Sequence, residues 1–265
     1  DFAPHAVKAG AVVIDNSSAF RMDPEVPLVV PEVNPQAILK HKGIIANPNC
    51  STIIMVMALK PIYDLAKIKR VIVSTYQAVS GAGKEGIDEL DAQVREHSEG
   101  REMTANILPS ASAEKHYPIA FNLIPQIDVF CDNLYTKEEM KMVNETKKIM
   151  EDYEMRITAT TIRVPVYRSH SESVNIELEK EVDLGAMREA LAKFPGVTVQ
   201  DDPSKQEYPM PLYTSEKDDV YVGRLRRDES CEKSYNMWVV GDQIRKGAAL
   251  NTLQIAETMI KNGWI

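Results

Sequence analysis

The stretch 47–50, Asn-Pro-Asn-Cys, is the feature that most constrains the fold of this chain, because a long apolar run follows it directly. Pro48 fixes its own φ and biases the preceding residue away from helical conformations, so the chain bends here. Asn49 is a favoured helix cap, since its side chain can accept an unpaired backbone N–H. The sequence therefore predicts a strand that ends near Ala46, a tight turn, and a buried helix that begins at Cys50.

Cys50 is a candidate nucleophile because of its place in that helix. A thiol in the first helical turn feels the positive end of the helix dipole and faces unpaired N–H groups. Both effects favour the thiolate, which is the reactive form of cysteine. The same N–H groups can stabilise an oxyanion formed when the sulfur attacks a carbonyl. The alternative is that Cys50 is a small buried apolar residue, which is the usual role of a free cysteine.

Composition excludes several functional classes. The chain has 265 residues, of which 44% are apolar and 26% charged, as is typical of an ordinary globular protein. The net charge is −8 and there is no long basic run, so nucleic acid and an acidic membrane surface are not expected partners. Small anionic substrates remain possible, because a local cluster of arginines can hold them within an acidic protein.

The three cysteines, Cys50, Cys131 and Cys231, are widely separated and odd in number. They provide neither a disulfide framework nor the ligand spacing of a zinc site, so we expect no metal and a reducing compartment, the cytoplasm. No apolar run approaches the roughly 20 residues that a membrane-spanning helix needs.

The N-terminal part of the chain is predicted to form the last strands of a parallel sheet. Apolar runs at 11–15, 28–30 and 43–46 are rich in β-branched residues, as buried parallel strands are. A dinucleotide-binding sheet opens with a strand, a glycine-rich loop and a helix. No such loop occurs before residue 49. We therefore expect either that the chain binds no dinucleotide, or that it begins inside a domain whose cofactor loop is missing.

The remainder of the chain alternates helical and strand patterns. Helices are expected at 50–65, 84–99, 137–151, 184–194 and 247–261, and strands at 70–76, 120–124, 156–168, 169–178, 220–226 and 236–240. This order predicts an α/β beginning followed by an α+β domain. The loop 80–83, Ser-Gly-Ala-Gly, lacks the pattern of a Walker loop, and a turn or a close approach to a ligand explains its glycines better.

A catalytic cysteine needs a base and groups that orient its substrate. His170, flanked by small polar residues, is the candidate base, although a lone histidine is usually structural. Arg163 is a candidate clamp for a carboxylate, with a surface or salt-bridge role as its alternative. Glu138 and Lys141, three residues apart on one helix, read most simply as an exposed ion pair.

Several blocks of the sequence together resemble one known family. They are 14–21 (Ile-Asp-Asn-Ser-Ser-Ala-Phe-Arg), 30–34 (Val-Pro-Glu-Val-Asn), 47–52 (Asn-Pro-Asn-Cys-Ser-Thr), 74–83 (Ser-Thr-Tyr-Gln-Ala-Val-Ser-Gly-Ala-Gly), 121–126 (Phe-Asn-Leu-Ile-Pro-Gln), 163–166 (Arg-Val-Pro-Val), 170–173 (His-Ser-Glu-Ser) and 246–251 (Lys-Gly-Ala-Ala-Leu-Asn). In this order and from end to end, the chain resembles the aspartate-β-semialdehyde dehydrogenases.

The resemblance implies a reversible, NADP-dependent reductive dephosphorylation of aspartyl-4-phosphate to aspartate-4-semialdehyde, within the biosynthesis of aspartate-derived amino acids. The resemblance further implies that Cys50 forms the thioacyl intermediate, that His170 is the acid/base catalyst and that Gln77 orients the intermediate. It implies that Arg163 binds the substrate α-carboxylate and Glu138 its α-amino group. The residues implied to bind phosphate are Arg21, Lys141 and Asn49. The same resemblance places Ser80, Gly81, Gly83 and Asn251 near the nicotinamide.

The family also suggests a domain plan: residues 1–49 as the remnant of a Rossmann-type domain, 50–244 as a larger mixed-sheet catalytic and dimerisation domain, and 245–265 as a helix that returns to the first domain. It implies a homodimer or homotetramer. Because the family's cofactor loop is absent, we expect a fragment that holds NADP poorly and is inactive by itself. Two alternatives stay open: an enzyme like N-acetylglutamyl-phosphate reductase, which fits 74–83 and the Glu138/Lys141 pair less well, and a non-catalytic dimerisation module with an inert Cys50.

Overall fold

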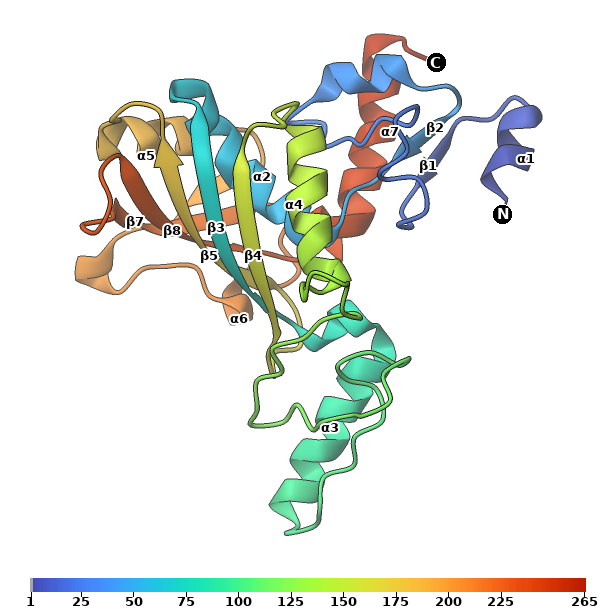
Figure 1. Ribbon diagram of the computed structural model, residues 1–265, viewed down its shortest axis with the longest axis vertical. Helices are drawn as coiled ribbons and strands as arrows, with labels where there is room; N and C mark the ends of the chain where they lie inside the picture. The colour runs from blue at the N-terminus through green and yellow to red at the C-terminus, as the bar shows by residue number, and fades with distance from the viewer. Residues whose placement is uncertain (1) are drawn as a thin grey trace.

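The computed structural model describes residues 2–265, and its centre is a six-stranded mixed sheet (Figure 1). The strand order is β4-β3-β5-β8-β7-β6. The strands are β3 (Ile68–Gln77), β4 (Arg156–Arg163), β5 (His170–Leu178), β6 (Val197–Val199), β7 (Val220–Arg227) and β8 (Ser234–Gly241). The pairs β3/β4 and β6/β7 are parallel and the others antiparallel. The predicted mixture of α/β and α+β patterns is therefore confirmed.

The helix that begins at Cys50 is the buried core of the molecule. This helix, α2 (Cys50–Leu65), packs on the sheet, and its residues from Ser51 to Leu59 are all buried. Asn49 caps it as predicted, because its side-chain oxygen accepts hydrogen bonds from the backbone N–H groups of Ser51 and Thr52 at 3.0 and 3.2 Å. The strand expected before the turn is β2 (Ile44–Ala46), which pairs in parallel with β1 (Val13–Asp15).

The other helices surround this core. They are α1 (Ala3–Lys8), α3 (Lys84–Ser98), α4 (Lys137–Ile149), α5 (Leu184–Lys193), α6 (Pro211–Thr214) and α7 (Leu250–Asn262). Helix α7 lies beside β1 and β2, and α3 projects away from the sheet together with the long loop that follows it (Figure 1). A small apolar cluster joins α7 to the N-terminal segment, and its buried members are Val29, Ala37, Ile38, Ile45, Ile255 and Met259.

Two of the expected strands are wrong. In 28–30 only Leu28 makes a bridge, to Ala46, and in 120–124 only Ile124 does, to Arg163. Residues 28–30 are apolar because they are buried, not because they extend a ladder. The closing helix also starts later than expected, because a π-helical segment, Arg245–Ala249, precedes α7. The short β6 and α1 were not expected.

Among the residues that the structure describes, no helix is both long and apolar enough to cross a bilayer.

Candidate active site

Cys50 lies at the first position of α2, under the π-helical segment Arg245–Ala249. A Cβ atom built on Gly247 would stand 2.9 Å from the Cβ of Cys50. Only glycine allows the backbone to approach the helix end so closely. The C-terminal part of the chain therefore packs directly on the candidate nucleophile.

Burial decides the protonation state of Cys50. Burial first, and then the negative charge of Glu138, raise the pKa of the thiol to about 12. Arg163, the N–H of Ser51 and Arg21 all act in the opposite direction but do not compensate. The expectation that the helix terminus favours the thiolate is wrong, because the loss of hydration raises the pKa of Cys50 more than the Ser51 N–H at the helix start lowers it.

Glu138 connects the predicted substrate residues. It sits in the first turn of α4, whose start is fixed by a capping box between Thr136 and Glu139. Its Oε1 accepts hydrogen bonds from the side-chain amides of Asn49, at 2.9 Å, and Gln77, at 3.3 Å. Lys141 donates to Oε2 at 3.2 Å. The interpretation of Glu138 and Lys141 as an exposed pair is wrong, because the side chain of Glu138 is only 7% exposed.

Arg21 and Glu145 form a second pair against the same turn. The guanidinium lies 3.3 Å from the Glu145 carboxylate, which also accepts the backbone N–H of Asn49 at 2.6 Å. Burial raises the pKa of Glu145 to about 6, although Arg21 and this N–H lower it. Arg21 and Lys141 line an open pocket of about 230 Å³, together with Ser18, Met22, Lys137, Met140, Asn144 and Glu145. Two predicted phosphate residues thus face one cavity.

Arg163 and His170 both form hydrogen bonds with the backbone of Ala78, directly after β3. The Ala78 carbonyl accepts a hydrogen bond from Nη1 of Arg163 at 2.7 Å, and the Ala78 N–H donates to Nδ1 of His170 at 3.0 Å. A Cβ on Gly81 would lie 2.7 Å from Arg163 Nη1 and 3.4 Å from His170 Nε2. The glycine thus lets the loop approach both side chains.

This part of the site keeps polar atoms without hydrogen-bond partners among the described residues. They include Arg163 Nε, His170 Nε2, Ser51 Oγ and both carboxyl oxygens of Glu172. Burial lowers the pKa values of Arg163 and His170 and raises that of Glu172. Unpaired buried polar atoms cost free energy, so these atoms are candidates for hydrogen bonds to a ligand.

The residues expected near the nicotinamide are only partly brought together. Ser80 and Gly81 belong to the 3₁₀ turn Val79–Ala82 beside His170, and the Ser80 hydroxyl is held by the amide of Gln243. Gly83 precedes α3 with φ of +82°. Asn251 lies elsewhere, where its amide donates to Asn47 and to the carbonyl of Val29.

Sequence reasoning missed Glu145, Glu172, Gln243 and the backbone N–H and carbonyl of Ala78. Glu172 was visible as a carboxylate within the 170–173 block, two residues after the candidate base. A main-chain hydrogen bond such as that of Ala78 leaves no sequence signal.

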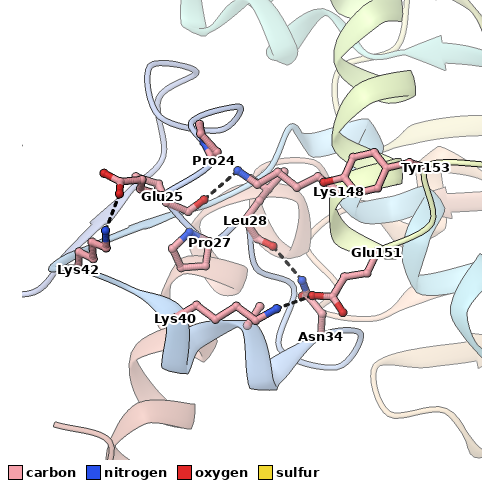
Figure 2. A pocket seen from close by; sticks show the side chains of 12 residues that line it. Pro24, Glu25, Pro27, Leu28, Asn34, Lys40, Lys42, Lys148, Glu151 and Tyr153 are labelled. Atoms are coloured by element: carbon pink, nitrogen blue, oxygen red, sulfur yellow. Dashed lines mark hydrogen bonds and ion pairs between the residues drawn. The ribbon is translucent and has the colours of Figure 1, made fainter.

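A pocket of about 470 Å³ lies apart from all of these residues, between residues 24–42 and the C-terminal end of α4 (Figure 2). Lys148 reaches into its wall to donate to the carbonyl of Val26, and Lys40 pairs with Glu151 across it. No predicted site residue lines this pocket.

Two family models match the chain. The model described as "Semialdehyde dehydrogenase, dimerisation domain" matches residues 59–246, and the one described as "Semialdehyde dehydrogenase, NAD binding domain" matches residues 1–41.

Individual relatives agree with these matches. The chain is 56% identical over 267 residues to an aspartate-semialdehyde dehydrogenase of Aquifex aeolicus, and the match covers 100% of the chain and 77% of the relative. The crystal structure of aspartate semialdehyde dehydrogenase II "complexed with ASA" from Vibrio cholerae superposes with a TM-score of 0.92 at 47% identity, over 98% of this chain and 76% of that one. A Candida albicans aspartate semialdehyde dehydrogenase "with NADP" gives 0.75 at 25% identity, over 100% and 75%.

Proposed function

We propose that this chain, which belongs to the aspartate-semialdehyde dehydrogenase family, forms a thioester between Cys50 and the aspartyl group of aspartyl-4-phosphate. The full reaction is then the reversible reductive dephosphorylation to aspartate-4-semialdehyde. The observation that carries this proposal is the set of hydrogen bonds that Glu138 accepts from Asn49, Gln77 and Lys141, because it gathers α4, the end of β3 and the start of α2 around the Cys50 turn. The Vibrio cholerae relative in complex with ASA supports the substrate class.

Each charged residue can meet one group of this substrate. Arg163, buried and with Nε unpaired, would clamp the α-carboxylate in two-point fashion. Glu138 would accept from the α-amino group. Arg21 and Lys141, at the open pocket of about 230 Å³, would hold the phosphate together with Asn49. Gln77, whose amide already reaches Glu138, would orient the thioester.

We assign the nicotinamide to the side of the 3₁₀ turn that contains Ser80 and Gly81, with Gly83 at its end. The backbone at Gly81 passes close to Arg163 and His170 without a side chain of its own, so this turn brings the predicted cofactor residues next to two predicted catalytic-site residues. Asn251 would act indirectly, because its amide holds Asn47 and Val29. When bound, NADP would supply or accept the hydride. The match to an NAD-binding domain and the Candida albicans relative with NADP support this choice.

We further propose a homodimer, or a tetramer built from dimers, within a reducing cytoplasm. The dimerisation-domain match supports the assembly. Exposed apolar side chains in the long loop after α3, Phe121, Leu123, Phe130 and Leu134, are suitable for burial in such an interface. The three cysteines are free in the structure, as a reducing compartment allows.

The acylation half-reaction tests this function without any cofactor. The chain is incubated with aspartyl-4-phosphate, and intact-mass spectrometry measures the gain of one aspartyl group, which hydroxylamine removes if it is a thioester. We expect the adduct on Cys50, none in Cys50→Ser, and much less in Arg163→Met. A chain that folds but never acquires the adduct would support the non-catalytic dimerisation module instead.

A further inference from the structure

The ammonium group of Lys148 holds the loop that carries Arg21, one of the proposed phosphate residues. Its Nζ donates to the backbone carbonyls of Arg21 at 2.8 Å, Asp23 at 2.7 Å and Val26 at 2.8 Å. These three bonds use all three hydrogens of the ammonium group. Figure 2 shows the side chain reaching from α4 to this part of the chain.

No strand ladder holds the segment 21–26 among the residues that the structure describes. Its main-chain hydrogen bonds are those of local turns, from the N–H of Asp23 to the carbonyl of Phe20 at 3.1 Å and from the N–H of Val26 to the carbonyl of Asp23 at 3.2 Å. The hydrogen bonds from Lys148 therefore attach the main chain of this segment to helix α4.

The guanidinium of Arg21 is oriented by the protein but keeps free donors. Nε donates to the carbonyl of Asn47 at 2.9 Å, Nη2 to the carbonyl of Asn16 at 3.0 Å, and Nη1 to Glu145 at 3.3 Å. Because a guanidinium has five N–H groups, one hydrogen on Nη1 and one on Nη2 have no partner among the described residues. The side chain lines the open pocket of about 230 Å³, so these hydrogens are suited to a phosphate there.

Helix α4 carries the second phosphate cation and the attachment of the loop on one face. Lys141, Glu145 and Lys148 follow one another at spacings of four and three residues, which places them on the same side of a helix. Lys141 lines the pocket, and Glu145 pairs with the side chain of Arg21. Lys148 binds the main chain of the same arginine. The distance between the two phosphate cations therefore depends on how the loop is attached to α4.

We propose that Lys148 is a positioning residue, which holds Arg21 in place opposite Lys141 and thereby sets the affinity of the site for phosphate. This role rests on the proposed function, since that function assigns phosphate to this pocket. Lys148 itself does not touch the phosphate, because its three hydrogens are used by the loop.

Titration with inorganic phosphate tests this role without cofactor or turnover. Chemical-shift changes of the ¹⁵N-labelled chain, at constant ionic strength, measure the half-saturating phosphate concentration. In Lys148→Met we expect this concentration to rise about tenfold, as when one hydrogen bond to a charged group is lost. Lys147→Met is the matched control, because it removes the same charge from the same helix and leaves the three bonds of Lys148 intact. It should bind phosphate like the native chain.

Lys141→Met separates the inference from the function on which it rests. If Lys141→Met binds phosphate as tightly as the native chain, or if the native chain shows no saturable binding, the proposed phosphate site is wrong and the inference falls with it. If Lys141→Met weakens binding and Lys148→Met does not, only the role of Lys148 is wrong.

The rate of Cys50 acylation by aspartyl-4-phosphate gives a measurement that a merely structural lysine would not change. Lys148→Met should need about tenfold more acyl phosphate for half-maximal rate and keep the native rate at saturation. A lower maximal rate with unchanged half-saturation would show a loss of folded protein instead and would overturn the proposal. If circular dichroism shows that Lys148→Met does not fold, Lys148→Gln, which keeps two donors, decides: it should also raise the half-saturating concentration, and a native value would overturn the proposal.

Discussion

Two buried cations, Lys246 and Arg163, differ in how completely the fold satisfies their hydrogen-bond donors. The Nζ of Lys246 donates to Glu32 at 2.6 Å, to Gln254 at 2.7 Å and to Asn251 at 3.0 Å, which uses all three of its hydrogens. Arg163 makes one hydrogen bond to the Ala78 carbonyl and leaves Nε without a partner. Both side chains are at least 96% removed from solvent.

This difference distinguishes a structural cation from a candidate ligand-binding one. The Lys246 cluster joins the C-terminal segment to residue 32 and is complete without a ligand, so its role is to hold the N-terminal segment and α7 together. Arg163 Nε, in contrast, has no hydrogen-bond partner among the described residues, as the proposed clamp for a substrate carboxylate requires. Unsatisfied buried groups are rare in native structures and therefore point to sites of binding.

The largest effect that this comparison predicts is on stability. Lys246→Met should reduce the free energy of unfolding by about 3–5 kcal/mol, because it breaks a buried pair and leaves Glu32 uncompensated. Arg163→Met, also buried, should change it by less than about 1 kcal/mol, since it gives up few hydrogen bonds. Urea denaturation of both variants measures the difference. Similar losses in the two would show that Arg163 is a structural cation.

Cys50 should react slowly in the free chain. A pKa of about 12, against 9.0 for an ordinary thiol, reduces the thiolate at neutral pH by about 10²–10³-fold, or roughly 3–4 kcal/mol. Alkylation by iodoacetamide, followed by intact mass with Cys50→Ser as control, should therefore be slow at neutral pH and still rise about tenfold per pH unit above pH 9, where the rate for an ordinary thiol levels off. Rapid alkylation at neutral pH would mean that the helix dipole prevails over burial.

Glu145 should make stability depend on pH in the weakly acidic range. Its folded-state pKa of about 6 lies above the ordinary 4.5, so the folded chain binds the proton more tightly. The resulting contribution, about 2 kcal/mol, is complete below about pH 4.5 and is lost as the pH rises to about 6. Urea midpoints of the native chain and Glu145→Gln across this range isolate it. Parallel pH profiles would contradict the assignment.

The two close glycines should give the smallest and most local effects. Gly247→Ala places a methyl group against the backbone of Cys50 and should cost about 1–3 kcal/mol. At Gly81 the methyl group meets the tip of Arg163, a flexible side chain, so Gly81→Ala should cost less stability but reduce Cys50 acylation. Thermal unfolding and the acylation assay separate the two. Unchanged acylation in Gly81→Ala would place the substrate away from Arg163.

The sequence by itself determined the features that depend only on residues close together in the chain. The Asn-Pro-Asn-Cys turn, the start of α2 at Cys50 and the mixed order of strands and helices follow from capping, proline geometry and periodicity. Such local patterns do not predict contacts between segments that are distant in the chain. Residues 28–30 were expected as a strand because an apolar run does not say whether it is buried in a ladder or against a helix.

Only the tertiary structure decided the electrostatics of the site. From the sequence, a thiol at a helix start favours the thiolate, and Glu138 beside Lys141 reads as a surface pair. The fold shields Cys50 from most of its water and places the charge of Glu138 near it, which reverses the first expectation. Glu138 accepts hydrogen bonds from Asn49 and Lys141, so the second pair connects the site instead of lying on the surface. The hydrogen bond that Nδ1 of His170 accepts comes from the backbone N–H of Ala78, 92 residues away in the chain. The physical reason is that hydration and charge act through space, and the fold alone sets those distances.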